Sequence, residues 1–341
     1  MAKLSFIIPA YNVGPYIGQM LASICRNEGL ATNVIEIVVV CDGASDDTPK
    51  VVKQFAAEHP KVKIRLMAQS HQGASAARNT GLKAASGAFV WFVDGDDMIT
   101  PFALKHILQA IETHPEVDVI NTGTPVRFSG KNTPEMAEPD AIAAQVMPPY
   151  GLFDENYSAL YLCHVRHIWR KEMLIRHHLR YPVGITTHED FAFTVSALLK
   201  AETALDLSAL STYLYRKHGK STTHARKRDD KTFQGNVLSA QKALQLILEE
   251  EKEKYAWNEA KQRAYQRVKN LLIATNITHL LDPLPLKFVR QALASLKKMG
   301  AYPIQPEPDH SSRLRFVMCR PWAIYAVSQL RRITKAIKTI A

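Results

Sequence analysis

The sequence predicts an α/β protein: a mostly parallel, twisted sheet flanked by helices, followed by a helical C-terminal extension. Short apolar runs alternate with helix-like segments along roughly the first hundred residues, which is the pattern of strands joined by crossover helices. The run 89–93 is continuously apolar, as expected for a strand buried on both faces of a sheet. Beyond about residue 226 the apolar residues recur at helical spacing instead.

The expected elements follow one another in a regular order. A proline or a glycine ends several of them, and the second helix begins with cap-forming Ser and Asp residues. The predicted elements are a strand to Pro9, a helix from about Pro15 to Cys25, a strand to Asp42, a helix ended by Pro60, a strand over 62–69, a helix closed by Gly87 and a strand over 88–97.

Polar residues stand at the carboxyl end of each predicted strand. In parallel sheets, ligands bind beyond these ends of the strands. We therefore expect the following segments to converge on one edge: 9–12, 42–43, 69–73 and 94–97.

Three carboxylates, those of Asp94, Asp96 and Asp97, follow the apolar run 89–93. Such a cluster cannot lie in an apolar interior without a cation or hydrogen-bond donors, so we expect it at the exit of the strand. Carboxylate oxygens suit Mg²⁺ or Mn²⁺, and such ions usually keep coordination positions open for substrate phosphates. The alternative is a surface turn in which Asp97 caps a helix that begins near Pro101.

The 341 residues carry a net charge of +11, with a pI near 9.4, which predicts attraction to anions such as phosphorylated metabolites, nucleic acid or a membrane surface. Nucleic acid is not expected as a partner, because the clearest basic concentration is at the C-terminal tail and is not interleaved with aromatic residues on a sheet. No run reaches about 18 apolar residues and no export signal is recognisable, so we expect a cytoplasmic protein. The cysteines lack C-x-x-C spacing and are interpreted as reduced thiols: Cys25, Cys41, Cys163 and Cys319.

Five segments, taken together, resemble glycosyltransferase family 2 in order and spacing. This resemblance implies an inverting enzyme with a nucleotide-diphospho-sugar transferase, or GT-A-type, fold over roughly residues 3–225. The chain departs from the family pattern at Cys41 and Ala44, and it lacks the Q-x-x-R-W motif of the processive synthases, which implies non-processive transfer. The segments are "SFIIPAYNVGPYIGQMLASI", "EIVVVCDGASDDTPKVV", "GASAARNTGLKAASGAFVWFVDGDD", "HEDFAFTVSAL" and "YLYRKHGKSTT".

The resemblance implies a nucleotide-diphospho-sugar donor, with UDP favoured, and Mg²⁺ or Mn²⁺ as cofactor. It places Asp94 on the donor ribose or the metal and Asp96 on the metal. For Asp97, a place behind them or at a helix cap is favoured over direct binding of the metal. Asp42 would accept a hydrogen bond from the uracil base; the alternative is a turn residue at a strand end. The nucleotide pocket would be lined by Pro9, Ala10, Tyr11 and Asn12.

Arg78 and the histidine pair at 164 and 167 each allow more than one interpretation. Arg78 lies among small residues that allow close backbone approach, and it could pair with phosphate, position the acids after the fourth strand, or be a surface arginine on an amphipathic helix. His164 and His167, three residues apart, could imitate a metal pair, although packing or an acceptor-pocket role is favoured.

For the reaction, the resemblance implies that Asp190 is the general base that takes the acceptor's proton, with Glu189 next in line. The alternative is a plain helix start, capped by Thr187, at which acidic residues are favoured. Arg216 and His218 are expected in a short loop that closes over the diphosphate, where His218 would complete the metal shell.

We expect a catalytic domain over 1–225 and a helical region over 226–341 that ends in a basic amphipathic tail. The tail suits the interface of an anionic membrane, or it packs its apolar stripe on the catalytic domain. The stripe consists of Ile324, Val327, Leu330, Ile333, Ile337 and Ile340, and the basic residues mostly away from it are Arg331, Arg332, Lys335 and Lys338.

These features predict a metal-dependent glycosyltransferase of the bacterial surface-glycan type, which moves a sugar to a glycan or lipid-linked acceptor, peripherally at the inner face of the membrane. One alternative is an inactive nucleotide-sugar-binding module, against which Asp42, Asp94, Asp96 and Asp190 together speak. The other is a sugar nucleotidyltransferase, which would carry a glycine-rich loop with Arg and Lys after the first strand. "PAYNVGPYIGQ" has no such loop, nor the G-x-G-x-x-G of a Rossmann fold.

Overall fold

The computed structural model describes residues 3–26, 34–129, 133–153, 163–218, 230–302 and 320–340. The chain divides into two compact units. The first unit comprises Met1–Gly184 and Ser196–Ser221, and the second comprises Ile185–Val195 and Thr222–Ala341. The domain boundary predicted at residue 225 falls within 219–229, outside the described residues, and stays a prediction.

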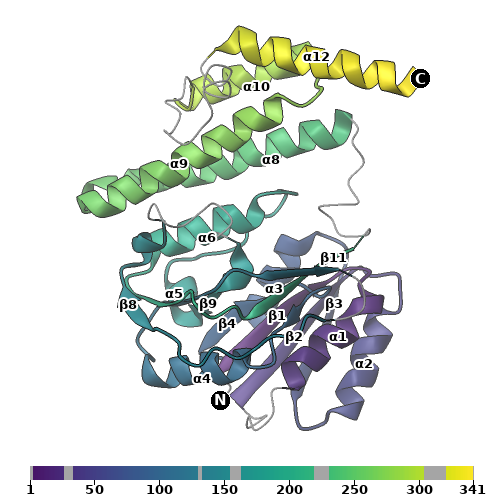
Figure 1. The fold of residues 1–341 in the computed structure, drawn as a ribbon, viewed down its shortest axis with the longest axis vertical. Helices are drawn as coiled ribbons and strands as arrows, with labels where there is room; N and C mark the ends of the chain where they lie inside the picture. Colours follow the sequence, from purple (N-terminus) through teal and green to yellow (C-terminus); the bar gives the residue numbers. More distant parts are fainter. Residues whose placement is uncertain are drawn as a thin grey trace. The chain divides into compact units, whose positions relative to one another are not determined.

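The first unit is built on an eight-stranded sheet (Figure 1). In sheet order its strands are β3 (Lys63–Gln69), β2 (Ile35–Asp42), β1 (Leu4–Ala10), β4 (Phe89–Phe92), β9 (His167–Arg170), β6 (Val119–Thr122), β10 (Ala204–Leu207) and β8 (Gln145–Met147). The first four strands are parallel to one another. β9 is antiparallel to both β4 and β6, and β8 is antiparallel to β10. Because β10 is parallel to β6, six strands share one direction, which confirms the predicted mostly parallel sheet.

Three strands of the parallel half, β1, β2 and β4, are buried on both faces, while β3 forms the half-exposed edge. Phe6 and Ile8 share one buried layer with α1 (Gly14–Cys25) and α4 (Ala103–Thr113). On the other face, α3 (Ala74–Ala84) lies so close that a β-carbon at Gly81 would be 2.4 Å from Ile7 Cγ2. Each large apolar side chain buried in these layers contributes about 1.5–3 kcal/mol.

The remaining helices of the chain's first two hundred residues are short. Those within the first unit are α2 (Thr48–Glu58), α5 (Lys171–Arg176) and the 3-10 turns η2 (Pro149–Phe153) and η4 (His164–Arg166). Helix α6 (Glu189–Lys200) begins in the second unit and ends in the first.

A second sheet of three strands, which the sequence did not predict, adjoins the end of β4. Its order is β5 (Met98–Ile99), β11 (Tyr213–Lys217) and β7 (Val126–Ser129), with β11 antiparallel to β5 and parallel to β7. The expectation of a loop at Arg216 is therefore wrong, because this residue is part of β11 and pairs with β7. The consequence is that β11 lies beside the residues that follow the acidic cluster.

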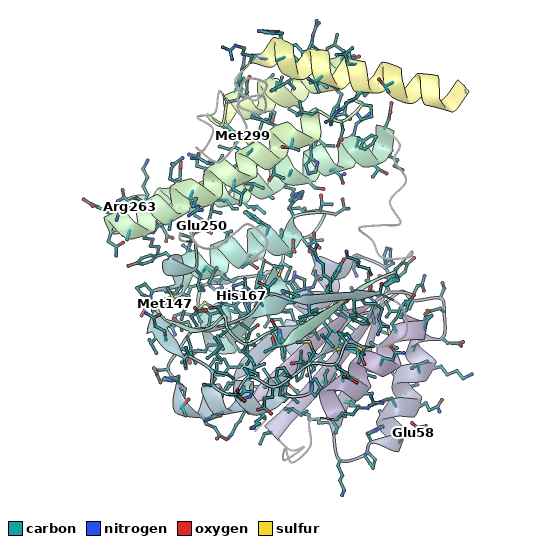
Figure 2. The ribbon with its side chains drawn as sticks, in the orientation of Figure 1. Glu58, Met147, His167, Glu250, Arg263 and Met299 are labelled. Carbon is teal, nitrogen blue, oxygen red and sulfur yellow. The ribbon has the colours of Figure 1, made fainter. Side chains whose placement is uncertain are left out.

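The second unit is helical, as predicted. Its helices are α8 (Asp230–Glu249), η5 (Glu250–Ala256), α9 (Glu259–Leu280), α10 (Leu286–Lys298) and α12 (Pro321–Ile340). Asn258 caps α9, since its side chain accepts a hydrogen bond from the backbone N–H of Lys261 at 2.8 Å. Gly300, with φ of 69°, follows the end of α10. Figure 2 shows Arg263 of α9 projecting away from this unit.

Among the helices that the structure describes, none combines the length and the apolar character needed to span a bilayer.

Candidate active site

Asp94 stands just beyond β4 and is held by two basic side chains of the first unit. Its Oδ1 accepts a hydrogen bond from Arg78 Nη2 at 2.8 Å and lies 3.6 Å from His164 Nε2. Burial alone would raise the pKa of this carboxyl, but Arg78 and His164 outweigh it and hold the pKa well below its usual range. Asp94 is therefore an ionised group with a set orientation.

Arg78 is the buried partner in this pair. It is 4% exposed, so the alternative of a surface arginine does not hold. Its guanidinium also lies over the ring of Tyr181, 5.0 Å from the centroid, which fixes its plane. The geometry agrees with the interpretation that Arg78 positions the acids after β4.

Asp97 points inward, away from solvent, and holds the second sheet to the acidic loop. It is 1% exposed; its Oδ1 accepts from the backbone N–H of Arg216 at 2.7 Å and its Oδ2 from the hydroxyl of Tyr213 at 2.9 Å. The same hydroxyl accepts from the backbone N–H of Asp94 at 3.0 Å. The helix-cap alternative is wrong, because Phe102 precedes α4 and no side chain caps that helix.

The side chain of Asp96 points toward His218. Its Oδ2 is 2.9 Å from His218 Nε2, and its backbone carbonyl accepts from Arg216 Nε at 2.9 Å. Tyr16 stacks on the His218 ring at 4.4 Å and also lies under the Arg216 guanidinium, 5.4 Å away. Gln19 accepts a hydrogen bond from Arg216 Nη2. The second sheet and α1 thus shape this side of the loop.

The three acids repel one another, and burial adds to the cost of ionising all of them together. Burial and Asp94 raise the pKa of the Asp96 carboxyl, against the opposing effect of His218. Burial, Asp96 and Asp94 raise the pKa of the Asp97 carboxyl well above its usual range. A bound cation would offset repulsion of this kind.

The donor set fits a divalent ion held by few protein ligands. No group of three or more His, Cys, Asp or Glu side chains in the described part of the chain is arranged to hold a metal. Asp96 and His218 supply one carboxylate and one imidazole, while Asp94, the third ligand expected from the sequence, is turned to Arg78. One or two carboxylates plus substrate phosphates is a common arrangement for Mg²⁺, so Asp96 with His218 fits the ion better than Asp94 does.

Asp42, at the end of β2, has a different environment. It is 2% exposed, and its Oδ1 accepts from Gln69 Nε2 at 2.8 Å and from the backbone N–H of Gln72 at 2.9 Å. Its Oδ2 accepts from the backbone N–H of Gly73 at 2.7 Å and lies 2.9 Å from His71 Nδ1. These contacts use all the sites of the carboxylate and tie segment 69–73 to β2. The predicted hydrogen bond to a uracil base stays a prediction and requires one of these contacts to give way.

The predicted nucleotide-lining segment lies beside Asp42. Tyr11 is 48% exposed and stacks on His71, with ring centroids 4.2 Å apart. Asn12 takes a left-handed conformation, with φ of 53°, and its Oδ1 accepts from the backbone N–H of Ser45 at 2.9 Å. Ala10 is buried and Pro9 half-buried at the end of β1. Only Tyr11 and Asn12 of this segment are exposed to solvent.

His164 and His167 do not converge on one point, so the metal-pair interpretation does not hold. His164 faces Asp94. His167 stacks on Trp169 among the packed side chains of the first unit (Figure 2), and its Nδ1 lies 3.2 Å from the carbonyl oxygen of Cys163. Burial, aided by Arg166, lowers the pKa of His167 to about 3, so this ring is neutral.

Glu189 and Asp190 form the first turn of α6, in the second unit. His188, just before them, has φ of 65°, a strained conformation for a side-chain-bearing residue, and its ring lies 5.3 Å from that of His279 on α9. The hydroxyl of Thr187 makes no hydrogen bond within the described residues, so it does not cap the helix. The role of Asp190 as base stays a prediction.

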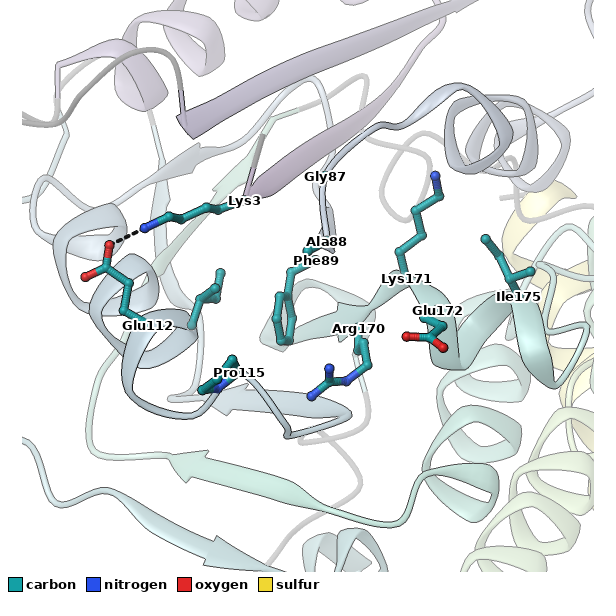
Figure 3. A pocket seen from close by; sticks show the side chains of 11 residues that line it. Lys3, Gly87, Ala88, Phe89, Glu112, Pro115, Arg170, Lys171, Glu172 and Ile175 are labelled. Carbon is teal, nitrogen blue, oxygen red and sulfur yellow. Dashed lines mark hydrogen bonds and ion pairs between the residues drawn. The ribbon is translucent and has the colours of Figure 1, made fainter. Parts of the chain in front are cut away.

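A cavity of about 630 Å³ lies in the first unit, away from all of these residues. Figure 3 shows it between the beginnings of β1 and β4 and α5, lined by residues that include Lys3, Phe89, Glu112, Arg170 and Ile175. The acidic cluster follows the opposite end of β4. Chemical character, not cavity size, therefore locates the candidate site.

Sequence reasoning missed the groups that hold the acids in place. Tyr213 and Gln69 are buried or half-buried neighbours of Asp97 and Asp42, and His71 stacks on Tyr11. The signal for Tyr213 is the aromatic and apolar run 213–215, which is typical of a strand. For Gln69 and His71 the only signal is their place in segment 69–73, at the end of a predicted strand.

The model of the family described as Glycosyl transferase family 2 matches residues 5–177, just over half of the chain. The uncharacterized glycosyltransferase EpsJ of Bacillus subtilis is 30% identical over 224 residues, which cover 64% of this chain and 62% of that protein. The uncharacterized glycosyltransferase YibD of Escherichia coli is 26% identical over 234 residues, or 68% and 66%. The chain thus spans slightly less than two thirds of the length of these relatives.

Solved structures share the fold. A crystal structure of TarS 1–349 from Staphylococcus aureus matches with a TM-score of 0.63 at 20% identity, covering 98% of this chain and 92% of that one. Mannosyltransferase PcManGT from Pyrobaculum calidifontis, in complex with GDP-Man and Mn²⁺, matches with a TM-score of 0.54 at 16% identity, covering 99% and 87%. The matched family model and the shared architecture show that the chain belongs to glycosyl transferase family 2 and has its GT-A-type fold.

Proposed function

We propose that the protein is an inverting, metal-dependent, non-processive glycosyltransferase that moves a sugar from a UDP-linked donor to a glycan or lipid-linked acceptor. The observation that carries the proposal is the group at the end of β4, where Asp94, Asp96, Arg78, Arg216 and His218 meet in a member of this family. Carboxylates, guanidinium groups and an imidazole at one strand end suit a diphosphate with its divalent ion.

Each of these residues would have a separate task. Asp96 and His218 would bind Mg²⁺ or Mn²⁺, and this ion would offset the charge that develops on the departing nucleoside diphosphate. Arg78 keeps Asp94 ionised and fixes its orientation, and Asp94 would then contact the donor. Arg216 holds the backbone of Asp96 through its Nε, and Tyr11 offers an exposed ring to the nucleobase.

Inversion requires attack on the anomeric carbon from the face opposite the diphosphate. The acceptor oxygen forms the new glycosidic bond while the bond between the anomeric carbon and the phosphate oxygen breaks. We assign the acceptor's proton to Asp190, and a carboxylate base of this kind contributes about 10²- to 10⁴-fold in rate. The strained backbone of His188 directly before α6 supports a functional role for this helix start.

The names of similar proteins support the choice of substrates. TarS of S. aureus, 30% identical over 213 residues, is a poly(ribitol-phosphate) β-N-acetylglucosaminyltransferase, and its structures include complexes with UDP and with UDP-GlcNAc. GgaB of B. subtilis, 30% identical over 132 residues, is a minor teichoic acid biosynthesis protein. A surface-glycan acceptor and a UDP-linked donor follow from these names as proposals, with a cytoplasmic enzyme that meets lipid-linked acceptors at the inner face of the membrane.

The donor and the metal can be tested together. Calorimetry should show UDP binding that is strengthened by Mn²⁺ in wild type and loses this dependence in Asp96→Ala, while Asp140→Ala, an exposed acid in another segment, behaves as wild type. Equal Mn²⁺ dependence in both variants would refute the metal assignment. Binding of nucleotide sugars with no transfer to any glycan acceptor would instead favour the inactive binding module.

The base is tested separately. Asp190→Asn should leave UDP affinity nearly intact and lower transfer by at least about 10²-fold. Glu189→Gln is the matched control, since it removes the adjacent acid of the same helix turn. A near-normal rate in Asp190→Asn with a large loss in Glu189→Gln would move the role to Glu189, and an NMR analysis of the product anomer would check inversion itself.

A further inference from the structure

Helix α12 presents two different faces along its first half. One face is packed within the second unit: Ala323, Ile324 and Ser328 are 3%, 0% and 0% exposed. The Ser328 hydroxyl donates to the carbonyl of Asp282 at 2.7 Å, and Gln329 Nε2 donates to the carbonyl of Leu284 at 3.0 Å. These contacts join α12 to the segment between α9 and α10, and α12 lies beside α10 (Figure 1).

The other face is apolar and open to solvent. Trp322 is 60% exposed and Leu330 63%, and the exposed Ala326 lies between them at a spacing of four residues. This differs from the stripe expected from the sequence, in which Ile324 and Val327 shared a face with Leu330. Packing takes Ile324 into the core, so the open face begins at Trp322 instead.

The sequence continues both patterns to the end of the helix. Positions 333, 337 and 340 are isoleucines that repeat the spacing of the open face, and basic residues occupy 331, 332, 335 and 338. No Asp or Glu follows Asp309. A helix with Trp and aliphatic residues on one side and Lys and Arg on the other is the pattern of helices that lie in a membrane interface.

We propose that the face formed by Trp322, Ala326 and Leu330 docks on the surface of an anionic lipid bilayer. Charge complementarity selects this occupant. Arg331 donates to the carbonyl of Leu281 at 3.1 Å and Arg332 lies 3.4 Å from Asp230, so the attraction is assigned to the exposed Arg320 and to the lysines at 335 and 338. Each basic residue near an anionic surface contributes about 1 kcal/mol. A second copy of the chain would bring an equally basic helix to the same place, which like-charge repulsion disfavours. The purpose of the docking rests on the proposed function, since a lipid-linked acceptor would be reached from this surface.

Intrinsic fluorescence offers a direct readout, because the four tryptophans differ sharply in exposure. Trp91 and Trp169 are fully buried and Trp257 is 8% exposed, so Trp322 alone is positioned to report a change at the surface. Full-length protein should co-sediment with vesicles of equal parts phosphatidylglycerol and phosphatidylcholine, with a blue shift of its emission. Vesicles of phosphatidylcholine alone should bind it far less, and high salt should reverse the binding.

Two variants distinguish binding through the proposed face from nonspecific adsorption to vesicles. Leu330→Glu should reduce vesicle binding by at least about tenfold, because it removes a leucine that would be buried in the bilayer and adds a negative charge that the anionic surface repels. Leu238→Glu, at a leucine of α8 that is 56% exposed, is the matched control and should bind as wild type. Trp322→Phe should keep most of the binding and lose the blue shift.

The proposal fails if wild type stays in the supernatant with anionic vesicles at low salt, or if Leu330→Glu and Leu238→Glu bind equally. It also fails if Leu330→Glu converts a dimer to a monomer in sedimentation velocity without changing vesicle binding, which would make the face a contact between copies. UDP binding measured without vesicles on the same preparations tells failure of the docking surface apart from failure of the proposed catalytic function.

Discussion

Asp42 and the acids after β4 stand at the ends of parallel strands in one sheet, yet their surroundings differ. The Asp42 carboxylate is met by hydrogen-bond donors from segment 69–73, including two backbone N–H groups. Asp96 is half-buried and Asp97 buried, each beside another acid, and this raises the pKa of both carboxyls. A carboxylate whose loop supplies all its donors organises that loop, whereas acids left short of positive charge form a place for a cation.

The largest effect should come from Asp96. Asp96→Asn is expected to lower metal-stimulated sugar transfer by at least about 10²-fold, since the amide keeps the shape but loses the charge that binds the ion. Transfer rates measured over a Mn²⁺ titration check this. If Asp96→Asn only slightly shifts the midpoint of the Mn²⁺ titration, then Asp96 does not bind the ion. The proposed difference between the acids after β4 and Asp42 would then be wrong.

Asp42→Asn should affect the nucleotide edge and leave the metal response in place. The new amide group would face N–H donors, which costs about 1–3 kcal/mol of unfolding free energy and loosens segment 69–73. UDP affinity should fall about tenfold by the same energetic scale, while the ratio of affinities with and without Mn²⁺ stays that of wild type. A loss of the Mn²⁺ effect in this variant would show that the two carboxylate sites act as one.

Tyr213→Phe tests the contacts that hold the acidic loop. The change removes the hydroxyl that bridges Asp97 and the backbone of Asp94 and should cost about 1–2 kcal/mol of unfolding free energy. Transfer should fall severalfold through kcat, with the KM for acceptor unchanged. Tyr215→Phe, half-buried on the same strand, is the control and should leave both the unfolding temperature and kcat near wild type.

The smallest effect concerns Glu36, a third carboxylate, which is donor-satisfied like Asp42. Burial opposes its ionisation, but hydrogen bonds from Ser5 and Ser86 and the contact with Lys63 lower its pKa from 4.5 to about 2. A carboxyl whose pKa is lowered by folding stabilises the folded state fully at pH values above its pKa in the unfolded chain. This contribution is lost as the pH falls through its pKa in the folded state. Glu36→Gln should therefore reduce stability by about 1–3 kcal/mol at neutral pH, and denaturant unfolding at several pH values should show the difference shrinking between pH 4.5 and about 2.

The sequence predicted the parallel half of the sheet, whose strands are either long or continuously apolar. β1, β2 and β3 have seven or eight residues each and end at Ala10, Asp42 and Gln69, within one residue of the predicted ends. β6, β9 and β10 have four residues each, too few to show a periodicity, and only pairing with neighbours makes them strands. The second sheet escaped prediction for the same reason.

In the candidate site, the residues that follow strands were predictable and their partners were not. Asp94, Asp96 and Arg78 lie close together in sequence, and their chemistry could be inferred from residue type. Tyr213 reaches Asp97 across 116 positions, and no local pattern announces such a contact.

The sequence by itself determined that the C-terminal segment is a basic amphipathic helix and that acids end a buried strand, because helical spacing, strand length and charge are local properties. The tertiary structure decided which side of α12 is open, since packing of Ala323, Ile324 and Ser328 leaves Trp322 and Leu330 in solvent. It also decided that donors meet both carboxylate oxygens of Asp42 and of Asp97, while Asp96 faces His218 through one oxygen. Burial and hydrogen-bond partnership depend on segments distant in sequence, and these set both the charge and the exposure of a side chain.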